Sequence, residues 1–232
     1  MIPNGHLCWV QRQRVEQRFG RNCLIIFFAA VVLTPNITLC LVRIFGKLGA
    51  SYFFLSGIFT IFEYFILFIA IFRCFHIISY QCQPTERPSS YDVGDCLLVV
   101  SSIVTTGYVT LNLIIQAIPL YSTHHSVLFM VQDAIRIIYY YLQTVFILQM
   151  RKFRICSLVS DMYSVRHVCL FIGVVHLGYW VIDTFVIAQY GFKLKNQIPN
   201  FDLNLTGMSW APAFIIFYRF ECFVCFYALY KV

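Results

Sequence analysis

Six long runs of apolar residues dominate this chain and limit its fold more than any other feature. The runs cover residues 23–42, 52–72, 93–118, 126–150, 168–190 and 208–230, and each is long enough to cross the apolar core of a bilayer as a helix. Only 12% of the 232 residues are charged, too few to give a soluble protein of this size a polar surface. We therefore predict an all-α, polytopic membrane protein whose six transmembrane helices form a bundle or barrel.

Lysines and arginines are shared unevenly between the two sides of these predicted helices. One side holds Arg12, Arg14, Arg18, Arg21, Arg73, Arg87, Arg151, Lys152, Arg154, Arg166 and Lys231, whereas the other holds only Arg43, Lys47, Lys193 and Lys195. Because the more basic side of a membrane protein faces the cytoplasm, we predict that both termini are cytoplasmic. Residues 1–22 would then form a basic cytoplasmic segment and residues 23–232 the membrane domain. The net charge of +7 therefore does not indicate a nucleic-acid partner.

The glycosylation sequons and the CxxC pair say less about the function of the chain. The sequon at Asn204 falls in a predicted external loop, where glycosylation is expected, whereas the one at Asn36 lies within the first predicted helix and is expected to be inert. Cys222 and Cys225 form a CxxC pair inside a predicted helix, which favours apolar packing over a metal site. The chain lacks HExxH and GxSxG motifs, so we expect neither an enzyme nor a cofactor.

Polar side chains recur inside the predicted helices at spacings that place them on one face of each helix. In chain order these faces hold Ser56, Thr60 and Glu63; Thr105, Asn112 and Gln116; Gln132, Arg136, Tyr140 and Gln143; and His176, Tyr179 and Asp183, with Trp180 beside the last set. The uncharged members are typical of hydrogen bonds that hold helices together, at about 0.6 kcal/mol each.

The ionisable residues indicate more than packing, because an Arg or Asp at bilayer depth costs about 2.5–3.5 kcal/mol on insertion scales and usually marks an ion path or a relay. The residues concerned are Glu63, Arg136, His176, Asp183, Arg219 and Glu221. We favour a functional interpretation for them. The alternative is a set of buried ion pairs, such as Arg219 with Glu63 or Arg136 with Asp183, and the sequence does not choose between pairings.

Arg219 and Glu221 lie two positions apart in the last predicted helix. This spacing turns the two side chains about 200° apart, so they cannot pair with each other. At least one of them therefore needs a partner on another helix or in water. We accordingly predict that the last helix lies between compartments of the bundle rather than at its rim.

Three segments resemble the last three membrane helices of the otopetrins. They are YYYLQTVFILQMRK at 139–152, FIGVVHLGYWVIDTF at 171–185 and APAFIIFYRFECFVCFYALYK at 211–231. That family forms acid-gated proton channels of twelve helices in two six-helix halves, assembled as dimers. The resemblance covers about residues 91–231 and implies the C-terminal half. With the N-terminal six helices absent, it implies either a fragment or a half-size protein that must pair with another chain.

The resemblance also carries over to single positions. Gln143 matches the family's glutamine in its tenth helix, Arg219 its arginine in the twelfth, and Trp180 a family tryptophan, whereas His176 replaces an asparagine, Glu221 a histidine and Ala228 a glutamate. A free imidazole titrates at about pH 6.5, so His176 relays protons more readily than the asparagine it replaces. The loss of a titratable group at Ala228 argues in the opposite direction.

The function implied by this resemblance is a proton-selective channel of the plasma membrane that conducts H+ in response to acid. We expect Gln143, His176 and Glu221 to line the route, Glu63, Arg136 and Arg219 to set its field, Asp183 to lie along it, and Trp180 and Tyr140 to serve in packing. The expected partners are protons, the bilayer, and further copies of the chain or a full-length otopetrin-like chain. The alternative is a non-conducting half-length subunit or fragment with a structural or regulatory role; an unrelated transporter or receptor is a weaker interpretation.

Overall fold

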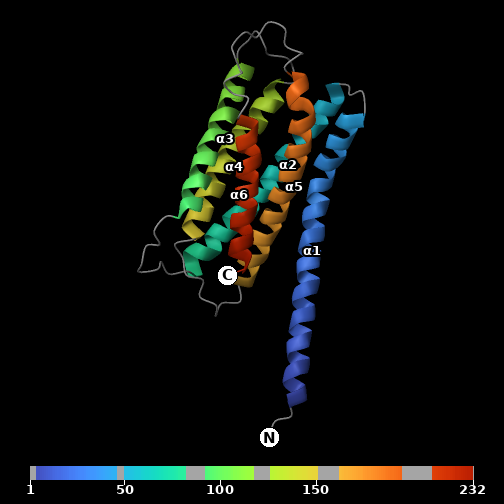
Figure 1. Ribbon diagram of the computed structural model, residues 1–232, viewed down its shortest axis with the longest axis vertical. Helices are drawn as coiled ribbons and strands as arrows, with labels where there is room; N and C mark the ends of the chain where they lie inside the picture. The colour runs from blue at the N-terminus through green and yellow to red at the C-terminus, as the bar shows by residue number, and fades with distance from the viewer. Residues whose placement is uncertain are drawn as a thin grey trace.

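Six α-helices make up the described part of the computed structural model, which comprises residues 4–45, 50–81, 92–117, 126–150, 162–194 and 211–231 (Figure 1). The helices are α1 (Asn4–Phe45), α2 (Ala50–Gln81), α3 (Val93–Ala117), α4 (Ser126–Met150), α5 (Met162–Leu194) and α6 (Ala211–Lys231). Among these residues there is no strand. The all-α prediction is therefore confirmed, and the bounds of α4 coincide with those predicted from the sequence.

Five of the six described helices are long and apolar enough to cross a membrane: Gly20–Leu39, Gly57–Ile78, Val93–Ile114, Val165–Phe185 and Ala213–Lys231. The helix α4, which the sequence also predicts to cross the membrane, is the exception because its hydropathy is lower. Its 25 residues are about 37 Å long, enough to cross a bilayer. It exposes an apolar stripe of Val127, Val131, Ile138 and Tyr141 and turns its polar residues inward, so its composition reflects what it faces inside the bundle.

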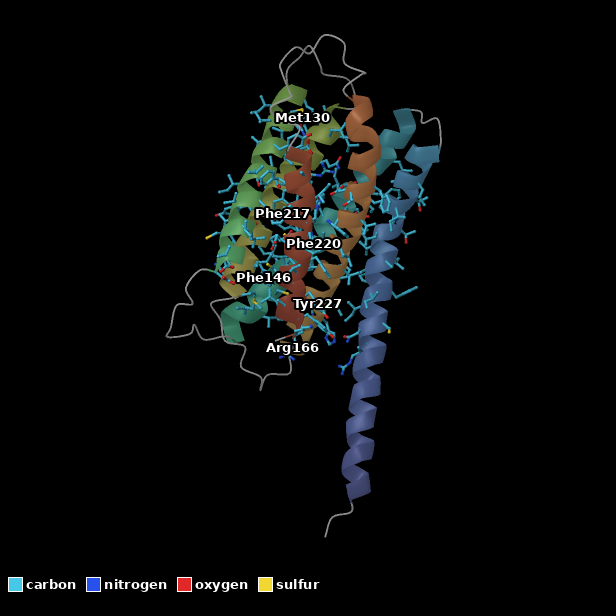
Figure 2. The ribbon with its side chains drawn as sticks, viewed as in Figure 1. Met130, Phe146, Arg166, Phe217, Phe220 and Tyr227 are labelled. Atoms are coloured by element: carbon cyan, nitrogen blue, oxygen red, sulfur yellow. The ribbon has the colours of Figure 1, made fainter. Side chains whose placement is uncertain are left out.

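The first residue of α1 and the last residue of α6 lie at the same end of the bundle, as Figure 1 shows. Arg166 lies at this end as well (Figure 2). From Asn4 onward the basic N-terminal segment is helical and continuous with the first span. Its helix projects beyond the other five (Figure 1). That this end faces the cytoplasm remains a prediction.

The helix α5 occupies the centre of the packing, against α6, α1 and α2. Two glycines let neighbouring helices approach closely. A Cβ atom added at Gly178 of α5 would lie 2.3 Å from Cδ1 of Leu33 in α1, and one at Gly57 of α2 would lie 2.6 Å from Cδ2 of Leu128 in α4. The absence of a side chain at these positions therefore sets how closely α1 can approach α5 and how closely α2 can approach α4.

The contact between α1 and α5 gives a first prediction. The substitution Gly178→Ala should lower the free energy of unfolding by about 1–3 kcal/mol, because Leu33 must move to admit the new methyl group. The measurement is thermal unfolding of the detergent-solubilised protein. In a chain that already carries Leu33→Ala, the same glycine substitution should cost less.

The control is Gly107→Ala, since an added Cβ at Gly107 meets no atom within 4 Å. Equal losses of stability for the variants at Gly107 and Gly178 would show that close packing at Gly178 is not what fixes α1.

Candidate functional site

Arg219 of α6 joins three other helices inside the bundle. Its Nη2 donates hydrogen bonds to the hydroxyl oxygens of Tyr64 in α2 and Tyr140 in α4, both at 2.9 Å. Its Nε lies 3.6 Å from Oδ2 of Asp183 in α5, and its side chain is only 4% exposed. A guanidinium at this depth needs such partners, because an unpaired charge in an apolar interior is strongly destabilising.

Aromatic rings enclose this guanidinium. Its central carbon lies 4.5 Å from the ring centroid of Tyr179 and 5.2 Å from that of Tyr140. The ring of Tyr64 stacks on that of Tyr179, with centroids 6.3 Å apart, and its hydroxyl oxygen lies 3.5 Å from that of Tyr140. The negative faces of these rings add cation–π attraction to the hydrogen bonds that hold Arg219.

Glu63 of α2 lies at the other end of the Tyr179 side chain. Its Oε2 accepts hydrogen bonds from the Tyr179 hydroxyl and from Nδ2 of Asn36 in α1. Thr60 donates to Oδ1 of the same asparagine at 3.3 Å. The second carboxylate oxygen of Glu63, Oε1, is buried and has no hydrogen-bond partner among the described residues. Asn36 thus lies inside a helix as predicted, but it binds a buried carboxylate there.

A second arginine lies near the first. Arg136 of α4 pairs with Asp133 one turn earlier in the same helix, at 3.3 Å, and Asp133 also accepts a hydrogen bond from Gln116 of α3 at 3.2 Å. The central carbon of the Arg136 guanidinium lies 5.9 Å from the ring centroid of Tyr64. Its side chain is 32% exposed, so it lies closer to the molecular surface than Arg219 does.

His176 of α5 belongs to a separate layer. Its Nε2 lies 3.1 Å from the hydroxyl oxygen of Tyr139, and its ring is stacked between the rings of Tyr139 and Phe226, at 6.1 and 6.0 Å. Gln143 is completely buried. Neither its amide oxygen nor its amide nitrogen, nor Nδ1 of His176, has a hydrogen-bond partner among the described residues.

Apolar side chains follow this layer toward the end of the bundle that holds both termini. Phe146 stacks on Phe226 at 5.9 Å, and Ile147 and Ile172 beside them are completely buried. Apolar packing therefore borders the layer of His176 on this side.

Hydroxyl groups extend the network sideways to α3. Tyr218 of α6 donates to the backbone carbonyl oxygen of Tyr140 at 3.2 Å, and its hydroxyl lies 3.0 Å from Oγ1 of Thr144. Thr144 in turn lies 2.9 Å from Oγ of Ser102. Polar contacts of this interior therefore involve all six described helices.

The structure brings together most of the residues that the sequence singled out. Glu63, Asp183, Arg219 and Tyr140 lie around one centre, with Arg136 at its edge. Both suggested ion pairs are wrong, however: Arg219 pairs with Asp183, and Arg136 pairs with Asp133.

Glu221 does not join this centre. It is half-buried on the flank of α6 and has no hydrogen bond or ion pair with the described residues. The same helix exposes Phe217, Phe220 and Tyr227 on its outer face (Figure 2). The prediction that α6 lies away from the rim is therefore wrong: the helix buries one face and exposes the other.

The remaining sequence-predicted positions are simpler to place. Trp180 is half-buried and packs on Phe220 of α6, with ring centroids 5.5 Å apart. Asn204, and the side chain of Ser56, lie outside the residues that the structure describes. Among the described residues no group of three or more His, Cys, Asp or Glu side chains is placed to bind a metal ion.

Three members of the centre are not predicted from the sequence. Tyr64 directly follows Glu63, Asn36 was judged only as a sequon, and Asp133 precedes Arg136 by one turn. The signal for Asn36 was an amide in an apolar run, and that for Asp133 was an acid three residues from an arginine. Nothing in the sequence distinguishes Tyr64 from tyrosines that face lipid.

Comparison with known proteins gives one family. The family model described as Otopetrin matches residues 22–220, which include every residue of the centre described above. No curated protein matches, and no solved structure does.

The hydrogen bond between Arg219 and Tyr64 gives a second prediction. The substitution Tyr64→Phe removes one of the two oxygens that accept from Nη2, and should lower the free energy of unfolding by about 1–3 kcal/mol. The control is Tyr141→Phe in α4, because Tyr141 is 66% exposed; its effect should stay within about 0.5 kcal/mol. Similar losses in thermal unfolding would mean that the Tyr64 hydroxyl does not help to hold Arg219.

Proposed function

The chain belongs to the otopetrin family, and we propose that it is a proton-selective channel that conducts H+ across the plasma membrane in response to acid. Otopetrins are a channel family rather than an enzyme family, and the apolar helices agree with an integral membrane protein. The observation that carries the proposal is the buried centre in which Arg219 joins carboxylates and tyrosine hydroxyls from three other helices.

The side chains of the route have different tasks in this proposal. Carboxyl, hydroxyl and imidazole groups can each accept a proton on one side and give one up on the other, whereas a guanidinium in a protein does not release its proton. His176 therefore carries protons, Asp183 lies along the route, and Glu63, Arg136 and Arg219 set the field around it. Gln143 and Glu221 line the route as well, Gln143 near His176 and Glu221 on the flank of α6.

Unpartnered polar atoms support a hydrated interior. Among the described residues, buried atoms without a hydrogen bond include Oε1 of Glu63, Nδ1 of His176 and both amide atoms of Gln143. Each such atom costs about 1–3 kcal/mol when it is left unsatisfied. Water molecules that bridge such groups would remove this cost and connect the side chains for proton transfer.

The third prediction tests the function directly. In cells that express this chain alone, a step of external pH from neutral to about 5 in sodium-free solution should evoke an inward current. Its reversal potential should follow the proton gradient, because protons are the permeant ion. Surface labelling of the same cells establishes that the protein has reached the membrane.

A half-length subunit is the second candidate function, and the apolar packing of Phe146 on Phe226 beside the polar interior favours it. A silent chain at the cell surface would contradict the channel proposal. Co-purification with a full-length otopetrin, and a changed current when both are expressed, would then support a regulatory role.

The role of His176 gives a fourth prediction. The variant His176→Ala should conduct with an altered dependence on external pH, because the ring that contacts the Tyr139 hydroxyl is lost. The variant His167→Ala is the control, since His167 lies on the same helix but outside the centre. An unchanged pH profile in His176→Ala would remove His176 from the route.

A further inference from the structure

Two buried groups of opposite charge each have an unused atom. Nη1 of Arg219 and Oε1 of Glu63 are buried, and neither has a hydrogen-bond partner among the described residues. The guanidinium lies on the ring face of Tyr179, whose hydroxyl donates to the carboxylate of Glu63. One tyrosine side chain therefore separates the two groups, and the charge of Arg219 acts on Glu63 across this distance.

We propose that Arg219 is a switch with two positions, one at Asp183 and one at Glu63, and that protonation of Asp183 moves it from the first to the second. The inference rests on the proposed function, because it names the residue through which acid would open the route. Asp183 is then a positioning residue: it acts by holding Arg219.

Accessibility makes Asp183 the member that external protons reach first. Its side chain is 28% exposed, against 4% for that of Arg219, and Glu63 as a whole is only 2% exposed. Of the two carboxylates in the centre, Asp183 is therefore the less enclosed one.

The surrounding charges supply the force. The described charged groups that act on Asp183 are Arg219 of α6 and Arg136 of α4. The helices α1 and α2, which also pack against α5, bring neutral Asn36 and the carboxylate of Glu63 to this region. A proton on Asp183 cancels the charge that holds Arg219. The repulsion from Arg136 then favours the departure of Arg219, and the unused Oε1 of Glu63 can accept a hydrogen bond from Nη1.

The position of Arg219 decides whether the hydroxyls of Tyr64 and Tyr140 are free to accept and donate protons. With Arg219 paired to Asp183, its Nη2 lies 2.9 Å from the hydroxyl oxygens of Tyr64 and Tyr140. A fixed positive charge at this distance opposes the arrival of a further proton. When Arg219 moves to Glu63, both hydroxyls become free to accept and donate. Arg219 thus has two arrangements, one at Asp183 and one at Glu63, and the protonation of Asp183 decides which of them is favoured.

The fifth prediction is a shift in the pH of activation. The variant Asp183→Asn mimics the protonated residue and should conduct at a proton concentration about tenfold lower than wild type requires, a typical coupling between linked sites. The variant Glu63→Gln removes the second position and should require more acid than wild type. The control Asp95→Asn changes a buried carboxylate that accepts from the Asp92 backbone at the start of α3, and its activation should match wild type.

A second measurement does not depend on conduction. Trp180 packs on Phe220, the neighbour of Arg219, and therefore reports the contact between α5 and α6. In a purified chain with Trp9→Phe and Trp210→Phe, the emission of Trp180 should change as the pH falls. Adding Asp183→Asn should fix the acid-form emission at every pH, whereas adding Asp183→Glu, which keeps a carboxylate, should preserve the change.

The two measurements separate the switch from the proposed function. If wild type carries no current but the emission of Trp180 titrates and Asp183→Asn abolishes the titration, the switch stands and the channel proposal fails. If wild type conducts but Asp183→Asn keeps both its activation and its emission unchanged, the switch is overturned. Should Asp183→Asn fail to fold, Glu63→Gln decides: wild-type activation and wild-type emission in that variant would overturn the switch.

Discussion

The buried guanidinium of Arg219 is the group on which the arrangement of the interior depends. A charged side chain is stable in an apolar environment only when nearby groups accept its hydrogen bonds and supply an opposite charge. Those partners come from three other helices: Tyr64 of α2, Tyr140 of α4 and Asp183 of α5. Because each helix must present its residue at the same depth, this one side chain fixes the relative heights of four helices. The stacking of Tyr64 on Tyr179 follows from the same requirement.

The composition of the helices follows from this interior. Apolar side chains such as Phe65, Phe72 and Ile103 are exposed on the outside of the bundle, while carboxylates, amides and hydroxyls are buried within it. The helix α4 shows the consequence most clearly, because it supplies polar residues to several parts of the network and is the one described helix too polar to qualify as a span by its own hydropathy. Its insertion in a bilayer therefore depends on neighbours that shield these residues.

The sequence could predict which faces are polar, but not which residues meet. The spacing of Arg136, Tyr140 and Gln143 identified the inward face of α4, because periodicity is a local property of one helix. The choice of Asp183 rather than Glu63 as the ion partner of Arg219 depends on the rotation and height of three helices relative to one another. For Glu221 the rotation argument correctly excluded a pair with Arg219. It could not show that α6 has a second face at the surface, because apolar and aromatic residues occupy both the buried and the exposed positions of that helix.

In a proton channel built on this centre, selectivity would follow from the same fixed charge. A sodium or potassium ion that reached the centre would have to lose its water close to the guanidinium of Arg219, whose positive charge repels it. A proton need not travel as an ion through this layer, because it can be exchanged between hydroxyl and carboxyl groups. The arginine would therefore exclude other cations at all times, and protons only while it remains against the tyrosine hydroxyls.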